Sequence, residues 1–178
     1  TERTIKSELP MSRNIVEGVK RTAGGSILAA RLALEHGACI HLGGGFHHGF
    51  ANHAEGFCYI NDVAIAAKVI ADEGLARKIA VIDTDVLQCY GTAHIFQDDD
   101  RVFTFSIHQD LLYPAKQKGD LDIGLHTSIG DEGYLKELAR GMDVIVNDVQ
   151  PDLAIIVAGV DPYENDRLGE LDLSWEGM

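Results

Sequence analysis

The apolar and polar positions along the chain follow two patterns that alternate from one end to the other. Apolar residues with helical spacing occupy SILAARLALE (26–35), VAIAAKVIAD (63–72) and residues 131–148. Short, almost continuously apolar runs occupy ACIHL (38–42), KIAVID (78–83), RVFTFSI (101–107) and LAIIVAG (153–159). Such runs are typical of strands buried on both faces of a parallel sheet. This order predicts an α/β fold of three layers, a mainly parallel sheet with helices on both faces.

Turn and capping residues mark the ends of the predicted helices. Gly37 follows the first helical segment, and Gly74 follows the second. Asn61 and Asp62 stand just before the second segment, where Asn and Asp side chains commonly cap a helix N-terminus. A long loop rich in glycine and histidine separates the first predicted strand from this helix.

Length and composition are those of one globular domain. The chain has 178 residues, of which 46% are hydrophobic and 24% charged, and this is enough for one sizeable core. No internal repeat, low-complexity tract or linker divides it. We therefore expect a single α/β domain over residues 1–178.

The formal net charge of −13 limits the classes of partner. Binding to nucleic acid requires a basic face, so nucleic acid is not expected as a direct partner. An acidic surface is compatible with a basic peptide or a lysine-bearing substrate. The run Asp98–Asp100 is interpreted as a solvated turn.

Cysteine usage and hydropathy predict the compartment. The three cysteines, Cys39, Cys58 and Cys89, form no CxxC pair, so we expect free thiols in a reducing environment. The polar stretch TERTIKSELP is unlike a signal peptide, and the apolar runs are too short to cross a membrane. The sequence thus predicts a soluble protein that is cytoplasmic or otherwise intracellular, without membrane contact; its oligomeric state is left open.

Each predicted strand is followed by a polar or glycine-rich segment. These segments are GGGFHHGF (43–50), DTDVLQCYGT (83–92), HQDLLYP (108–114) and VDPYENDRLG (160–169). In parallel sheets, ligands bind outside the carboxyl ends of the strands. We therefore expect the four segments to meet at one edge of the sheet.

The residues in these segments suggest metal-assisted hydrolysis. His47 and His48 form a tandem pair that is suited to acid–base chemistry. Three aspartates, Asp83, Asp85 and Asp161, lie at strand exits as well. A metal held by carboxylates would polarise a carbonyl and activate water, while a histidine handles the proton.

Longer motifs resemble those of a known family. They are GGGFHHGFANHAEGFCYINDVAIAAK, VIDTDV followed by GTAHIF, FSIHQ, and VAGVDPYENDRLGELDLSWEGM. From about Gly24 onward the chain resembles the zinc-dependent histone deacetylase family, especially class IV members and their bacterial relatives. The resemblance implies an arginase-like α/β fold and hydrolysis of the amide of acetyl-lysine or a similar small acylated amine. Zn²⁺ is the implied cofactor, with K⁺ as a structural ion.

The resemblance also implies a role for individual residues. His47 and His48 resemble the catalytic pair, and Asp83 resembles the carboxylate that orients the first of them. The remaining implied positions are the zinc ligands Asp85 and Asp161, the wall of the substrate tunnel at Gly56 and Phe57, and a structural potassium site at Asp83, Asp85 and Ser106.

The sequence departs from the family pattern after Asp85. Leu87 occupies the position of the usual histidine ligand, and Cys89 and Tyr90 replace a glycine and an asparagine or aspartate. Cys89 is the candidate substitute ligand because thiolate binds zinc strongly; Gln88 and His94 are poorer candidates. The transition-state tyrosine of the family lies in a glycine-rich loop that is not found here, so we expect a domain without parts of the family's N- and C-terminal regions.

Two hypotheses of function therefore stand. The first is a deacetylase-like, metal-dependent amide hydrolase. The second is a catalytically impaired relative that acts as a binding or structural protein. Bound zinc and turnover of an acetyl-lysine peptide favour the first, whereas ligand binding without turnover favours the second.

Overall fold

A four-stranded parallel sheet forms the centre of the fold. The computed structural model describes residues 10 and 12–178. The strands are β1 (Ile79–Asp83), β2 (Val102–Gln109), β3 (Leu121–Leu125) and β4 (Leu153–Val157). Their order across the sheet is β3-β2-β1-β4, and all three neighbouring pairs are parallel. The carboxyl ends of the strands thus lie at one edge, as the sequence predicts.

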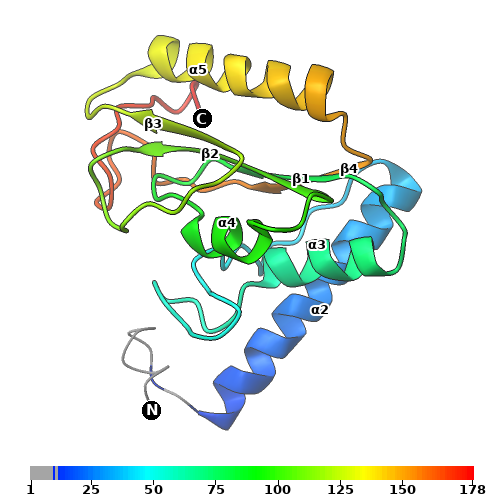
Figure 1. Ribbon diagram of the computed structural model, residues 1–178. Coiled ribbons are helices and arrows are strands. Elements are labelled where there is room, and N and C mark those ends of the chain that lie inside the picture. The colour runs from blue at the N-terminus through cyan, green and yellow to red at the C-terminus, as the bar shows by residue number, and fades with distance from the viewer. Residues whose placement is uncertain (1–9, 11) are drawn as a thin grey trace.

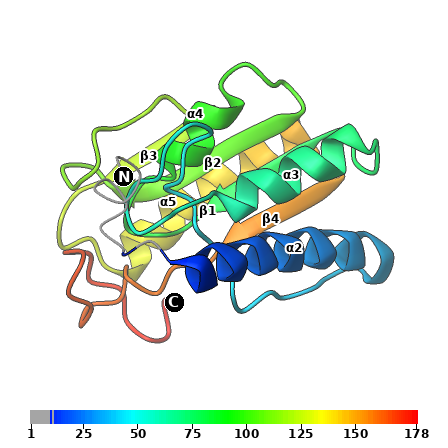
Figure 2. The same ribbon diagram turned by 90° about the horizontal axis from the view of Figure 1, so that it is seen from below.

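Helices cover both faces of this sheet (Figures 1 and 2). One face carries α2 (Arg13–His36), α3 (Asp62–Asp72) and the short α4 (Tyr90–Phe96). The other face carries α5 (Asp131–Val144), which continues as a single π-helical turn, η1 (Ile145–Val149). The three-layer architecture confirms the predicted fold class.

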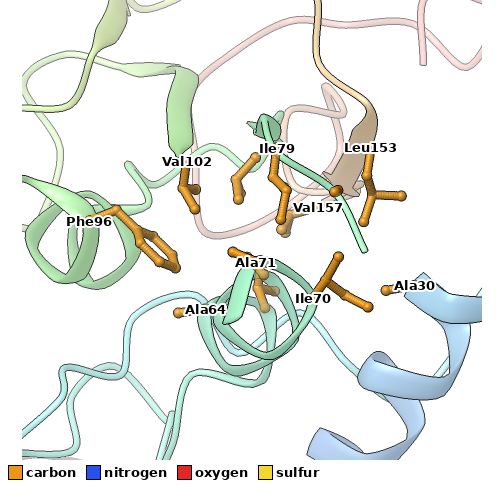
Figure 3. Packing of buried hydrophobic residues seen from close by; sticks show 13 residues of the cluster. Ala30, Ala64, Ile70, Ala71, Ile79, Phe96, Val102, Leu153 and Val157 are labelled. Carbon is orange, nitrogen blue, oxygen red and sulfur yellow. The ribbon is translucent and has the colours of Figure 1, made fainter. Parts of the chain in front are cut away.

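Burial on both faces explains the continuously apolar run of β1, whose five residues are all buried. Ile79 and Val81 pack into the cluster under α3, which Figure 3 shows together with Val102, Leu153 and Phe96. Ala80 and Ile82 point to the opposite cluster, on the side of α5. Such a strand needs apolar residues at successive positions, because no position faces water.

The predicted helices are present, with adjusted ends. Asn61 caps α3 as expected, since its side-chain oxygen accepts a hydrogen bond from the backbone N–H of Ala64. The first helix is longer than the apolar pattern predicts, because it begins after Ser12, whose hydroxyl oxygen caps it. It ends at Gly37, which adopts a φ of 93°. The predicted helix at 131–148 is divided between α5 and η1.

The predicted strand at residues 38–42 is wrong. The segment forms no ladder, and Ile40 and Leu42 are 84% and 96% exposed. Instead, the segment contacts α2: the His41 ring forms a hydrogen bond of 3.0 Å with the Ser26 hydroxyl on that helix. An apolar run becomes a strand only beside a partner strand, and β4, at the sheet edge, pairs with β1 alone among the described residues.

Strand β3 was missed. Its alternation of Leu121, Ile123 and Leu125 is interrupted by Asp122 and Gly124, two residue types that are rare in strands. The strand lies at the edge of the sheet beside β2, where one half-buried face suffices.

No helix within residues 10 and 12–178 combines the length and the apolar character that crossing a membrane requires.

Candidate active site

Three of the four predicted segments bring their acidic and histidine side chains together at the carboxyl edge of the sheet. Asp83 ends β1, Asp85 follows it in the loop, and Asp161 lies four residues beyond β4. Asp85 and Asp161 converge on Gly159, where an added Cβ would stand 2.7 Å from Asp85 Oδ2 and 2.9 Å from Asp161 Oδ1. The loop with His47 reaches the same place although the predicted strand before it is absent.

His47 is held by Asp83. Its Nδ1 lies 2.5 Å from Asp83 Oδ2, and both side chains are buried. Because a carboxylate only accepts, Nδ1 carries the proton, and Nε2 points toward Asp85 Oδ1 at 3.8 Å. Burial lowers the pKa of His47, but the charge and hydrogen bond of Asp83, together with Asp85 and Asp161, outweigh it and raise this pKa to about 9. The surrounding carboxylates therefore favour the protonated form of His47.

His48 is neutral. Its ring stacks on His47 with centroids 3.9 Å apart, and on Tyr90 at 4.7 Å. Burial, then the charge of His47 and that of Lys116, lower the pKa of His48 to about 2. Its buried Nδ1 has no hydrogen-bond partner. Tyr90 lies against the ring face and does not offer this nitrogen an acceptor.

The two carboxylates that face each other hold protons more tightly than usual. Burial, with the nearby charges of Asp83 and Asp161, raises the pKa of Asp85 to about 7 against the opposing effect of His47. Burial raises the pKa of Asp161 as well. Backbone N–H groups fix both: that of Leu87 donates to Asp85 Oδ1 and that of Val86 to Asp161 Oδ1, each at 2.9 Å. The carboxylate pair is thus preorganised by the loop itself.

Within residues 10 and 12–178, no third ligand joins this pair. Leu87 packs against the core on the α5 side of the sheet, and Cys89 is fully buried, with a thiol pKa that burial raises well above its ordinary value. Gln88 is bound to the 117–122 segment, and His94 lies exposed on α4. Across the part of the chain that the structure describes, no three His, Cys, Asp or Glu side chains are grouped to hold a metal ion.

The donor set therefore does not fit a catalytic zinc site as it stands. Such a site uses three protein ligands, usually with nitrogen or sulfur among them, and leaves one position for water. Here two oxygen ligands are available. An oxygen-only pair favours harder cations such as magnesium or manganese and binds zinc weakly.

Comparison with known proteins decides the family. Residues 1–178 match the family described as the Histone deacetylase domain. The chain belongs to the histone deacetylase family. This confirms the resemblance that the histidine and aspartate motifs predict.

Individual relatives of this histone deacetylase family member agree. An uncharacterized protein of Picosynechococcus sp. is 46% identical over 171 residues, covering 96% of this chain and 57% of its own length. Histone deacetylase 2 of Arabidopsis thaliana is 30% identical over 172 residues, covering 94% of this chain and 44% of that protein. The crystal structure of an HDAC homologue complexed with SAHA gives a TM-score of 0.79 at 26% identity, covering 88% of this chain and 45% of that one. The chain thus spans about half the length of these relatives.

One of the two residues predicted for the deacetylase tunnel, Gly56, borders His48. Gly56, at a φ of 51°, lies so close that an added Cβ would stand 2.6 Å from His48 Cδ2. Phe57 also has positive φ, at 60°, and its side chain is 55% exposed. A bulky side chain at position 56 would push the histidine aside, whereas the Phe57 ring is free to contact a ligand.

The residues predicted for the potassium site are near neighbours, since the backbone N–H of Asp85 donates to Asp83 Oδ1 at 3.0 Å. Asp83 and Ser106 are direct neighbours on β1 and β2. The Ser106 hydroxyl forms a hydrogen bond of 2.9 Å with Nδ1 of His108, a buried residue that the sequence analysis did not name. The potassium site stays a prediction.

Two further polar residues beside the site were missed. The Tyr90 hydroxyl lies 3.1 Å from that of Tyr113, which donates to Glu55 Oε1, also at 3.1 Å. Tyr113 belongs to the predicted exit segment HQDLLYP, so the sequence located the segment but not this contact. Glu55 lies in an irregular loop, whose path no local pattern predicts.

Proposed function

We propose that this protein hydrolyses the amide bond of acylated amines, with acetyl-lysine or a small acetylated amine as the substrate class. The observation that carries the proposal is the Asp83–His47 hydrogen bond, which aims Nε2 of His47 at the Asp85–Asp161 carboxylates in a member of the histone deacetylase family. Amide hydrolysis needs a proton acceptor for water and a proton donor for the leaving amine.

The two histidines differ in the way this chemistry requires. Asp83 keeps the proton on Nδ1 of His47 and stabilises the cationic ring, which can donate from Nε2. His48 is neutral, so its ring can accept a hydrogen bond from water, although burial and the charge of His47 make it a weak base. The pair therefore combines a donor and an acceptor whose rings are in contact.

The metal requirement is the finer part of the proposal. The family resemblance implies zinc, which would polarise the substrate carbonyl. Since Asp85 and Asp161 fall short of a zinc donor set, we assign no step to a metal and propose that any cation is held weakly. The test must therefore be run both with and without added metal.

The acidic surface and Phe57 fit a cationic, flexible amine. A net charge of −13 attracts substrates that carry lysine or polyamine groups. The exposed Phe57 ring offers an apolar contact for the alkyl part of such a chain. We therefore place the acylated end near His48 and the cationic remainder toward solvent.

The test measures acetate release from an acetyl-lysine peptide and from an acetylated polyamine. The protein is assayed with EDTA and with added Zn²⁺ or Mn²⁺, alongside His47→Ala as an inactive control and Leu87→His as a variant with the usual third ligand. Turnover that requires metal and is lost in His47→Ala supports the proposal. If even Leu87→His with bound zinc releases no acetate from either substrate, the proposed activity is wrong.

A further inference from the structure

Asn61 and Asp62, at the start of α3, form hydrogen bonds with the backbone on both sides of the His47–His48 pair. The Asp62 carboxylate accepts hydrogen bonds from the N–H of Phe46 at 2.7 Å and of Gly45 at 3.2 Å, just before the pair. The Asn61 amide donates to the carbonyl of His47 at 2.9 Å and of Gly49 at 3.1 Å, at and just after the pair. One side chain accepts and its neighbour donates, so the four contacts together fix the path of the loop.

These two side chains are themselves immobilised. The Ser26 hydroxyl of α2 donates to Asp62 Oδ2 at 2.5 Å. The Asn61 amide nitrogen also lies 2.9 Å from the Thr92 hydroxyl of α4, while the Asn61 side-chain oxygen caps α3 at Ala64. Both residues are buried. Elements α2, α3 and α4 thereby all hold the loop through one dipeptide.

Helix capping alone does not account for these contacts. A cap needs only the bond between the Asn61 oxygen and the backbone of Ala64. A buried carboxylate such as Asp62 is costly unless several donors satisfy it, and here two of its three donors belong to the histidine loop. The sequence predicts both residues as caps, and their contacts with the loop leave no signal in it.

Close backbone packing leaves the loop no alternative position. A Cβ on Gly49 would stand 2.7 Å from the backbone of Ile60, and one on Gly91 would stand 2.6 Å from the backbone of His48. The loop is thus pressed between the start of α3 and the start of α4. A small displacement of its backbone would separate His47 from Asp83, because their bond spans only 2.5 Å.

We propose that Asn61 and Asp62 are positioning residues that fix the backbone around His47 so that its ring meets Asp83. Neither touches the reacting groups; they act through the main chain. The inference deepens the proposed hydrolase activity and takes its functional meaning from it. The positioning itself can be measured without any turnover.

The experiment compares Asn61→Ser and Asp62→Asn with the parent protein. Serine retains helix capping but cannot reach the His47 and Gly49 carbonyls, so this variant separates positioning from capping. Asparagine keeps the shape of Asp62 and loses its charge. Ile123→Val is the control, a mild core substitution on the other face of the sheet. NMR reports the low-field Nδ1 proton of His47, and hydrogen exchange reports the Phe46 amide.

We expect both variants to shift or broaden the His47 Nδ1 proton signal. We expect exchange of the Phe46 amide to speed up about tenfold or more in Asp62→Asn, since a charge-assisted hydrogen bond is weakened. Ile123→Val should change neither signal. If Asp62→Asn does not fold, the Nδ1 proton signal of His47 in Asn61→Ser alone tests the inference.

An unchanged His47 signal in folded Asn61→Ser would overturn the inference. A changed signal in a protein without acetate release would instead support positioning while rejecting the proposed hydrolase activity. Where the parent is active, the variants should lose kcat and keep KM, because positioning acts on the chemical step. A loss confined to KM would contradict the inference.

Discussion

Replacing Asp85 with asparagine should stabilise the metal-free protein. Asp85 and Asp161 converge on Gly159 without a third ligand, so their negative charges face each other in a partly buried space. Asparagine removes one charge and keeps an oxygen that can accept from the N–H of Leu87. The substitution should therefore remove the cost of burying this charge, and the smaller repulsion from Asp83 and Asp161, without breaking the loop.

The magnitude follows from the pKa of Asp85, which the fold raises from 3.8 to about 7. One pH unit of such a difference is worth about 1.4 kcal/mol, so ionised Asp85 costs the folded state on the order of 4 kcal/mol above pH 7. Because the folded state binds the proton more tightly than the unfolded state, the stability of the parent falls as pH rises from about 4 to about 7. This pKa already includes the attraction to His47, and the asparagine amide is itself partly buried, so we expect Asp85→Asn to gain about 2–4 kcal/mol at pH 8 and almost nothing below pH 4.

Urea denaturation followed by far-UV circular dichroism, with EDTA at pH 4 and pH 8, measures this difference. Asp98→Asn is the control, because it makes the same chemical change in an exposed turn. It should change the free energy of unfolding by less than about 0.5 kcal/mol at either pH. A loss of stability in Asp85→Asn at pH 8, or an equal gain at both pH values, would refute the reasoning.

Two other substitutions test the site and the packing beneath it. Leu87→His supplies the missing third ligand next to Asp85 and Asp161, and isothermal titration should show zinc binding at least about tenfold tighter than in the parent; equal affinity would mean that position 87 does not face the carboxylates. Gly91→Ala should lower the free energy of unfolding by about 1–3 kcal/mol, because its Cβ would stand 2.6 Å from the backbone of His48 and Gly49. Its matched control, Gly18→Ala in α2, has nothing within 4 Å of the added Cβ and should gain about 0.5–1 kcal/mol in the same urea experiment. A loss in both alanine variants would point to a general effect of the substitution.

The parts of the fold that the sequence predicts are those that leave a pattern in consecutive residues. Strand β1 is buried on both faces and therefore has an apolar residue at every position before Asp83. The start of α3 is decided by the Asn61 side chain and the Ala64 backbone, three residues apart. The cap needs no distant segment, and the apolar run of β1 indicates burial on both faces without identifying the strands beside it, β2 and β4.

The errors lie where a distant neighbour decides the outcome. Residues 38–42 are as apolar as β1, yet no strand runs beside them, so they follow α2. β4 was expected to be buried on both faces, but Ile156 is 63% exposed at the edge of the sheet. An apolar pattern indicates that a segment prefers to be buried. It does not indicate which neighbouring strand or helix will cover that segment.

The site shows the same division. The rule for carboxyl ends of parallel strands placed Asp83, Asp85 and Asp161 together correctly. It could not show that Asn61 and Asp62 grip the histidine loop, because those bonds depend on the path of an irregular segment. Nor could it show that His48 Nδ1 is left without a partner, which follows from how Tyr90 stacks.

The groups that position the site do not depend on a metal. Backbone N–H groups hold Asp85 and Asp161, and Asp83 holds His47. Since all of these bonds form within the protein, a leucine at position 87 removes a ligand without dismantling the arrangement around it. The geometry therefore implies that one added imidazole is enough to test whether the remaining residues can act as a hydrolase. If several supporting residues also had to be rebuilt, Leu87→His would bind no more zinc than the parent.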